Sequence, residues 1–186
     1  MGKLKKNAVL VVIDVQKGWD TYGLSKRNNI DAELKIAKLL DIWRSSGRPV
    51  VFFQHMSKNP ISPLYPGQSG NEIKDVVKPV AGEYIFHKSV NSCFIGTDFE
   101  EWLRERMYDT LVITGITTQH CVSTTARMSG NLGFTTFVVS DATAAFESKG
   151  VDGTIYDPET VHAVSLATIN REFATILKTE ELEELL

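Results

Sequence analysis

A cysteine stands between a buried apolar run and an amphipathic stretch, in the segment LVITGITTQHCVSTT at residues 111–125. Residues 111–113 are β-branched or otherwise apolar, as a buried parallel strand requires, and the pattern after Cys121 is helical. In the first turn of a helix, unpaired backbone N–H groups and the helix dipole favour the thiolate, which is the nucleophilic form. On its own, the segment still favours an unreactive core cysteine, because buried free cysteines usually behave as small hydrophobic side chains.

Two further reactive side chains follow predicted strands. Asp14 comes directly after an apolar run, and Lys88 lies just past another. Alone, Asp14 suits the cap of a turn and Lys88 suits a solvated surface amine. Ligands of parallel α/β sheets bind at the carboxyl ends of the strands, so we expect Asp14, Lys88 and Cys121 to converge there.

Such a group is chemically sufficient for acyl transfer. Asp14 can take the proton of Cys121, and Lys88 can stabilise the thiolate and fix the carboxylate. Backbone N–H groups of Thr117 and Cys121 can hold the oxyanion.

The elements that must position these residues alternate between short apolar runs and longer amphipathic ones. This alternation predicts an α/β fold with three α/β/α layers around a six-stranded parallel sheet. The predicted strands are Ala8–Ile13, Pro49–Phe53, Tyr84–Phe86, Thr110–Thr114, Thr135–Val139 and Thr175–Leu177.

Helical signals fill the gaps between the strands. Apolar residues repeat at helical spacing from Ile36 to Trp43, and Asp157-Pro158 predicts a cap followed by proline at the first helical position. Thr97 to Glu100 has the spacing of a capping box, with Phe99, Trp102, Leu103 and Met107 as the following apolar stripe, and Gly133 suits a helix end. Residues 54–82 carry too many prolines and glycines for a long element, so this loop is a candidate pocket wall.

Composition narrows the class of protein. With 186 residues, 42% of them hydrophobic, the chain fits one domain spanning residues 1–186. The net charge of -3 is dispersed, which argues against nucleic acid, and the apolar run from Ala8 to Ile13 is too short for a secretory core or a membrane span. We therefore expect a cytoplasmic protein, without nucleic-acid or membrane partners, in which Cys93 and Cys121 form no disulfide framework.

The chain resembles the isochorismatase-like or nicotinamidase-like cysteine hydrolases. The resemblance rests on VVIDVQKGW (11–19), HKSVNSCFIGTDFEEWL (87–103), GITTQHCVSTTARMSGNLGF (115–134), SDATAAF (140–146) and HAVSLATINREFA (162–174). It implies a six-stranded parallel sheet and a triad that falls on Asp14, Lys88 and Cys121. It also implies a cis peptide between Ile116 and Thr117 that orients the oxyanion-hole amides, a small-molecule substrate, and a homo-oligomer, either dimer or tetramer.

Within that family, KRNN (26–29), SPLYPGQSGNE (62–72) and VNSCFIGTD (90–98) resemble a subgroup that includes streptothricin-hydrolase-like enzymes. Nicotinamidases, by contrast, hold a metal with an Asp-x-His pair after the second strand and a further histidine. Here that stretch reads Phe53-Gln54-His55-Met56, and one imidazole without a nearby carboxylate is a poor ligand set. We therefore expect neither a metal nor another cofactor.

Several side chains near the expected site are candidates for binding substrate. Trp19 and Phe94 are aromatic walls that suit a planar or cyclic substrate, although both also fit an ordinary core or lid. Polar candidates are His55, Gln119, His120 and Arg27, the last as a partner for a substrate carboxylate. Asn29 is more simply explained as a helix cap.

The leading hypothesis is a metal-independent cysteine hydrolase of a small amide, lactam or carbamoyl compound. An isochorismatase-type enzyme that cleaves an ether or ester stays open, although true isochorismatases typically lack the nucleophilic cysteine. A catalytically idle α/β binding module, with an unreactive Cys121, also stays open. An FMN or nucleotide-binding protein is disfavoured because the first predicted strand is followed by no GxGxxG motif, and the sequence has no Walker-type loop.

Overall fold

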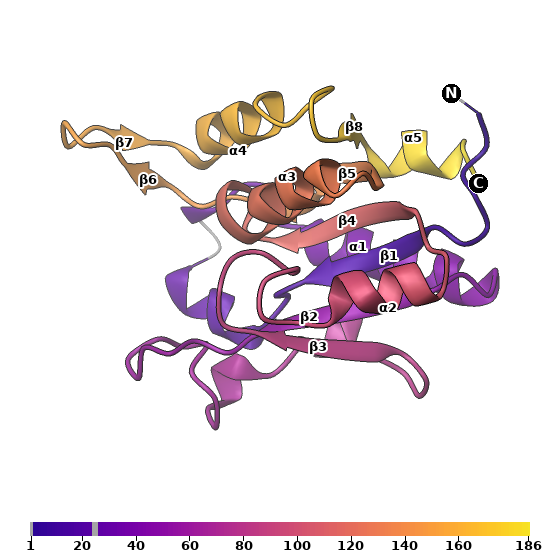
Figure 1. The fold of residues 1–186 in the computed structure, drawn as a ribbon. Coiled ribbons are helices and arrows are strands. Elements are labelled where there is room, and N and C mark those ends of the chain that lie inside the picture. The colour runs from indigo at the N-terminus through magenta and orange to yellow at the C-terminus, as the bar shows by residue number, and fades with distance from the viewer. Residues whose placement is uncertain (1, 24–25) are drawn as a thin grey trace.

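The computed structural model describes residues 2–23 and 26–186, and its main sheet has six strands in the order β3-β2-β1-β4-β5-β8 (Figure 1). All neighbouring strands of this sheet run parallel, which confirms the predicted fold class. The strands are β1 (Val9–Ile13), β2 (Val50–His55), β3 (Tyr84–Lys88), β4 (Thr110–Ile116), β5 (Thr135–Ala144) and β8 (Thr175–Leu177).

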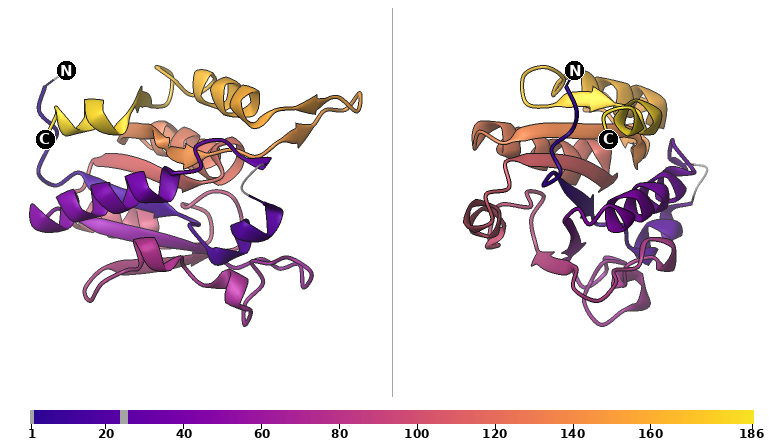
Figure 2. Two further views of the ribbon diagram at one scale, coloured as in Figure 1. Left: turned by 180° about the vertical axis from the view of Figure 1, so that it is seen from behind. Right: turned by 90° about the vertical axis from the view of Figure 1, so that its right-hand side faces the viewer.

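Helices cover both faces of the sheet because the buried strands are apolar on both sides. In β1, Val9, Val11 and Ile13 face one core and Leu10 and Val12 the other. The first core is closed by α2 (Phe99–Glu105), α3 (Ser123–Asn131) and α4 (Pro158–Ala167), the second by α1 (Ala32–Ser45) and α5 (Thr179–Glu183), as the two views of Figure 2 illustrate.

Several strands continue past the ends predicted from the apolar runs. β2 ends at His55 and β3 at Lys88, where the two residues are paired in the ladder. Polar side chains ended the apolar pattern here, although the backbone pairing continues. Lys88 is therefore the last residue of its strand rather than a residue of the following loop.

Two of the predicted helix ends are confirmed. The Asp157 side chain accepts a hydrogen bond from the backbone N–H of Thr160 at 2.9 Å, with Pro158 in the first turn of α4. Gly133 follows α3 with a φ of +83°, the left-handed conformation that glycine adopts most easily.

The predicted capping box before α2 is wrong. Asp98 is the N-cap residue and makes no side-chain capping bond, while the Thr97 hydroxyl donates to the carbonyl of Cys93 at 2.5 Å. Met107 lies beyond the end of α2 and is 81% exposed, so it does not belong to the buried stripe.

The long connection between β2 and β3 is irregular, as predicted, apart from the short 3₁₀ turns η3 (Ser69–Asn71) and η4 (Asp75–Val77). Asn71 anchors it, because its side-chain amide donates to the carbonyls of His55 and Leu64 at 2.8 and 2.7 Å.

A small antiparallel hairpin was not predicted from the sequence. It consists of β6 (Ser148–Lys149) and β7 (Ile155–Tyr156), and it projects from the body of the molecule beside α4 (Figure 1). Among the described residues, no helix has the length and apolar character needed to cross a membrane.

Candidate active site

The strand order reverses between β1 and β4, and this is where Asp14 and Cys121 lie. β1 is flanked by β2 and β4, so the chain after β1 turns to one side and the chain after β4 to the other. The two strands pair as far as Ile13 and Gly115, where a Cβ on the glycine would lie 2.1 Å from the carbonyl oxygen of Ile13. Glycine at position 115 therefore permits the close approach that brings the two strand ends together.

Lys88 joins Asp14 to Cys121. Its Nζ lies 2.5 Å from Oδ2 of Asp14 and 3.3 Å from Sγ of Cys121, and it also donates to the carbonyl of Val90 at 3.1 Å. The side chains of Asp14 and Lys88 have no exposed surface, and Cys121 is 6% exposed. The three side chains predicted from separate strand ends are thus in contact with one another.

Charge and burial set the resting protonation of this group. Burial opposes the charged form of Lys88, but Asp14 and Cys121 outweigh it and raise the pKa of the ammonium above its ordinary value. Burial and the charge of Asp14 raise the pKa of the Cys121 thiol, against the opposing effect of Lys88. The resting residue is therefore a thiol at neutral pH, because burial outweighs any effect of the helix terminus, and its proton is available for transfer to Asp14.

Asp14 has one oxygen free for proton transfer. Oδ2 is taken by Lys88, whereas Oδ1 is buried without a hydrogen-bond partner among the described residues. The residue has a φ of +51°, and the Trp19 indole donates to its carbonyl at 2.6 Å. The 3₁₀ turn η1 (Lys17–Tyr22) thus fixes the backbone of Asp14 through Trp19.

The turn that carries Cys121 is a single π-helical turn, η5 (Thr118–Val122), which leads directly into α3. The peptide bond between Ile116 and Thr117 that precedes it is cis. The Thr117 carbonyl accepts from the N–H groups of His120 and Val122, both at 3.2 Å.

The side chains of this turn differ in exposure. Oγ1 of Thr117 and Oε1 of Gln119 are buried without partners in the described part of the chain. His120, by contrast, is exposed.

His55 enters the site from the end of β2. Its Nδ1 lies 3.3 Å from Nζ of Lys88 and 4.0 Å from Oδ2 of Asp14. Burial, with a smaller effect of Lys88, lowers the pKa of His55 despite the nearby Asp14, so the imidazole is neutral at pH 7. Gln16 holds its backbone from both sides, accepting from the N–H at 2.8 Å and donating to the carbonyl at 3.1 Å.

The donor set available to a metal is richer than the sequence suggested. A carboxylate oxygen of Asp14, a ring nitrogen of His55 and Sγ of Cys121 lie within 4.8 Å of one another, so the statement that no carboxylate lies near His55 was wrong. Distant strands supply these groups, which spacing along the chain does not show. The Lys88 ammonium, however, contacts all three and already supplies the positive charge, so the set does not fit a resident metal ion.

The two aromatic candidates have different surroundings. Trp19 packs with Tyr22 and Phe146, each pair of ring centroids 5.7 Å apart, beside the backbone of Asp14. Phe94 instead stacks on Phe134 and packs against Phe99, in the core beneath α2. Phe94 is only partly buried and packs against the edge of this core, so its role as a wall of the site remains a prediction.

Two assignments around residues 26–29 need correction. The guanidinium of Arg27 is buried against both carboxylate oxygens of Glu33, which leaves it committed to an ion pair instead of a substrate carboxylate. Asn29 does not cap α1, because the N-cap residue of this helix is Asp31. The side chain of Asn29 instead donates to the carbonyls of Ser140 and Thr143 at 2.9 and 2.7 Å.

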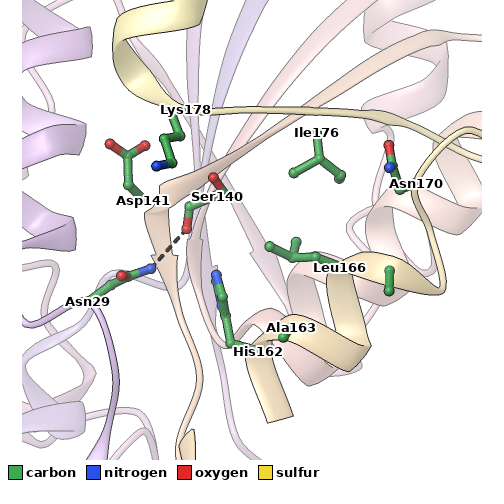
Figure 3. Close-up of a pocket in the computed structure, with 10 residues that line it drawn as sticks. Asn29, Ser140, Asp141, His162, Ala163, Leu166, Asn170, Ile176 and Lys178 are labelled. Atoms are coloured by element: carbon green, nitrogen blue, oxygen red, sulfur yellow. Dashed lines mark hydrogen bonds between the residues drawn. The ribbon is translucent and has the colours of Figure 1, made fainter. Parts of the chain in front are cut away.

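A cavity of about 450 Å³ lies between α4 and the strands β5 and β8 (Figure 3). His162 lines it, and Nδ1 of this buried ring lies 2.9 Å from the hydroxyl of Thr118. Sequence reasoning missed this contact, as it missed Gln16 and Asn71, because each residue has an ordinary polar type and finds its partner far along the chain. The remaining lining residues are Asn29, Ser140, Asp141, Ala163, Leu166, Ala167, Asn170, Ile176 and Lys178.

Comparison with known proteins assigns the family. The isochorismatase domain model matches residues 8–181. The isochorismatase family protein YrdC of Bacillus subtilis is 50% identical over 96% of each chain. The crystal structure of an isochorismatase-family protein from Chromobacterium violaceum superposes with a TM-score of 0.95 and 34% identity, covering 100% of this chain and 96% of that one. Ureidoacrylate amidohydrolase RutB of Methylobacterium radiotolerans is 26% identical, over 95% of this chain and 78% of its own length. The chain therefore belongs to the isochorismatase family of hydrolases.

Proposed function

We propose that this protein is a cysteine hydrolase that cleaves the C–N bond of a small amide, lactam or carbamoyl compound through a thioester on Cys121. The observation that carries the proposal is the position of Lys88 Nζ, within hydrogen-bond distance of both Asp14 Oδ2 and Cys121 Sγ. A relative that is named an amidohydrolase, RutB, supports the choice of bond.

In the first half-reaction, Oδ1 of Asp14 takes the proton of the Cys121 thiol, and the sulfur attacks the carbonyl carbon. Lys88 stabilises the thiolate while it exists. The backbone N–H groups of Thr117 and Cys121 stabilise the oxyanion of the tetrahedral intermediate. Asp14 then returns the proton to the nitrogen, and the amine leaves as the thioester forms.

In the second half-reaction, water replaces the amine. Asp14 takes a proton from the water as it attacks the thioester carbonyl, and the carboxylic acid is released as Cys121 regains its proton. The sum of the two halves is amide plus water giving acid plus amine. Asp14 thus acts as base and acid in each half.

The substrate side of the proposal rests on polar atoms that lack partners. Oδ1 of Asp14, Oγ1 of Thr117 and Oε1 of Gln119 are buried acceptors without partners among the described residues. Buried acceptors without donors are costly, and of these three only Oδ1 of Asp14 belongs to the group formed with Lys88 and Cys121, so we infer that a substrate N–H pairs there. Trp19 offers an apolar wall beside Asp14, and His120 is available from the exposed side of the turn.

Four further expectations remain predictions: a single domain over residues 1–186, membership of the streptothricin-hydrolase-like subgroup, a cytoplasmic location and a homo-oligomeric assembly.

A screen tests the proposal. Small primary amides, lactams and ureido compounds are incubated with the wild-type protein and with Cys121→Ala, and ammonia or amine release is measured. We expect release by the wild type alone. Cleavage of ethers or esters without any amide turnover would favour the isochorismatase-type reaction instead, and equal release by Cys121→Ala would overturn the proposal.

A further inference from the structure

The Lys88 ammonium has more acceptors than protons. It carries three N–H bonds, and four acceptors surround it. Oδ2 of Asp14 lies at 2.5 Å, the Val90 carbonyl at 3.1 Å, and Nδ1 of His55 and Sγ of Cys121 both at 3.3 Å. A charged carboxylate and a backbone carbonyl take two of the three N–H bonds. The imidazole and the sulfur, at equal distance, therefore compete for the third.

We propose that His55 is a positioning residue that holds the third N–H of Lys88 whenever Cys121 is uncharged and releases it to the sulfur when Cys121 becomes a thiolate. This inference rests on the proposed function, in which the thiolate of Cys121 is the nucleophile.

The charge on the sulfur decides the competition. A thiol or thioester sulfur is a weak acceptor, whereas an unprotonated imidazole nitrogen is a good one, so His55 wins while Cys121 is uncharged. A thiolate carries a full negative charge, so its Coulomb attraction for the buried ammonium exceeds that of a neutral imidazole nitrogen. His55 thus stabilises the thiol and thioester relative to the thiolate.

The position of His55 is built into the fold rather than left to a flexible loop. It is the last residue of β2 and pairs directly with Lys88 in the ladder. The fully buried Gln16 holds both its N–H and its carbonyl, and Asn71 donates to the same carbonyl at 2.8 Å.

The charges around the ring leave Nδ1 able to accept. Asp14 from β1 and Lys88 from β3 face the imidazole, and Cys121 faces it from the turn after β4. Burial lowers the pKa of His55, so the ring remains neutral near pH 7. Cys93 also lies near Lys88 and Cys121, but burial raises the pKa of its thiol, so it stays uncharged near neutral pH.

A matched pair of variants isolates the acceptor. In His55→Asn, the amide oxygen can stand close to the position of Nδ1, and in His55→Leu a side chain of similar shape has no acceptor. Without the acceptor, Lys88 loses its hydrogen bond to residue 55. This loss destabilises the states in which Cys121 is uncharged, but not the thiolate state, in which that N–H is bound to the sulfur. The thiolate fraction of His55→Leu should therefore rise.

The measurement is the rate of iodoacetamide alkylation of Cys121 between pH 6.5 and 9, followed on the peptide that contains Cys121 by mass spectrometry. At each pH, we expect alkylation roughly 2- to 10-fold faster in His55→Leu than in His55→Asn, the factor that one hydrogen bond supplies. His55→Asn should stay near the wild type. Thermal unfolding of both variants checks that they are folded.

Equal rates in the two folded variants would overturn the role of His55. If either variant fails to fold, the same comparison is made between His55→Gln and His55→Met, and equal rates there would overturn it as well. The test needs no substrate, so its failure is distinguishable from failure of the proposed function. Equal alkylation rates overturn only the role of His55, whereas amide turnover that persists in Cys121→Ala overturns the nucleophile.

Discussion

The carboxylate of Asp14 and the ammonium of Lys88 form an ion pair, 2.5 Å apart, that has no contact with solvent. Asp14 directly follows β1, and Lys88 is the last residue of β3. The strand β2 lies between them, and its last residue, His55, is close to both side chains. A buried pair of this kind is costly to break, because a single remaining charge has no compensation. Lys88 occupies Oδ2 of Asp14, while Oδ1 has no partner among the described residues, and a carboxylate oxygen of Asp14 lies within 4.8 Å of Sγ of Cys121. The proposed mechanism uses this difference between the two oxygens.

Removal of one partner of this pair should be worse than removal of both. We expect Lys88→Met to lose about 3–5 kcal/mol in the free energy of unfolding, because the Asp14 carboxylate remains buried and unpaired. The double variant Asp14→Asn/Lys88→Met should recover part of that loss. Urea denaturation measures all three proteins, and a double variant less stable than Lys88→Met would refute the account of the pair.

Gly115 should tolerate no side chain. Gly115→Ala places a Cβ 2.1 Å from the carbonyl oxygen of Ile13 at a φ of +123°, so β1 and β4 must separate. Gly133→Ala is the control, since its φ is +83° but its Cβ meets open space. We expect the control to cost about 1–2 kcal/mol and Gly115→Ala to cost more, with loss of folding in thermal denaturation as the extreme. Equal costs would show that the strand approach is not tight.

The contact between His162 and Thr118 should stabilise the turn that carries Cys121. Replacing His162 by Phe leaves a buried hydroxyl without its partner, with an expected loss of about 1–3 kcal/mol. In a double-mutant cycle with Thr118→Val, which removes the hydroxyl as well, the double variant should lose less than the sum of the two single variants. Guanidinium denaturation gives the four free energies, and strict additivity would indicate no interaction.

The buried ion pair between Arg27 and Glu33 predicts that the stability of the protein depends on pH. Burial alone would raise the pKa of Glu33, but hydrogen bonds from Arg27 and Lys74 lower it to about 2, from an ordinary value of 4.5. A lowered pKa in the folded state stabilises the protein fully above pH 4.5, and the contribution is lost as the pH falls from there through 2.

Glu33→Gln removes this titration. Its stability should fall less steeply than that of the wild type between pH 5 and pH 2, as measured by urea denaturation at each pH. Glu100→Gln, at an exposed pair with Arg104, serves as the control and should follow the wild type. Identical slopes for Glu33→Gln and the wild type would contradict the lowered pKa.

The sequence was sufficient to predict the six strands of the main sheet, although β2 and β3 each extend two residues beyond the predicted ends. Short β-branched runs such as Leu111-Val112-Ile113, ended by glycine or polar residues, favour buried strands, and parallel strands bring their carboxyl ends to one edge. The convergence of Asp14, Lys88 and Cys121 follows from topology, and it needed no knowledge of side-chain contacts.

Contacts between residues distant in the chain were beyond the same reasoning. The pattern of Arg27 is compatible with either a substrate carboxylate or Glu33, and only the fold brings Glu33 to its guanidinium. His55 likewise lay among the candidates with no assigned partner, because its pairing with Lys88 depends on where β2 and β3 end. The sequence likewise shows the effect of the helix terminus on Cys121 but not the burial that opposes it and raises the pKa of the thiol.

An acid quench during turnover detects the thioester that we propose on Cys121. During turnover of an amide identified by the screen, the wild-type protein is quenched with acid and digested, and the mass of the peptide that contains Cys121 is measured by mass spectrometry. The account predicts an added mass equal to the acyl portion of the substrate on Cys121, and neither the adduct nor turnover in Cys121→Ala. An acyl group on another residue, or turnover that persists in Cys121→Ala, would contradict it.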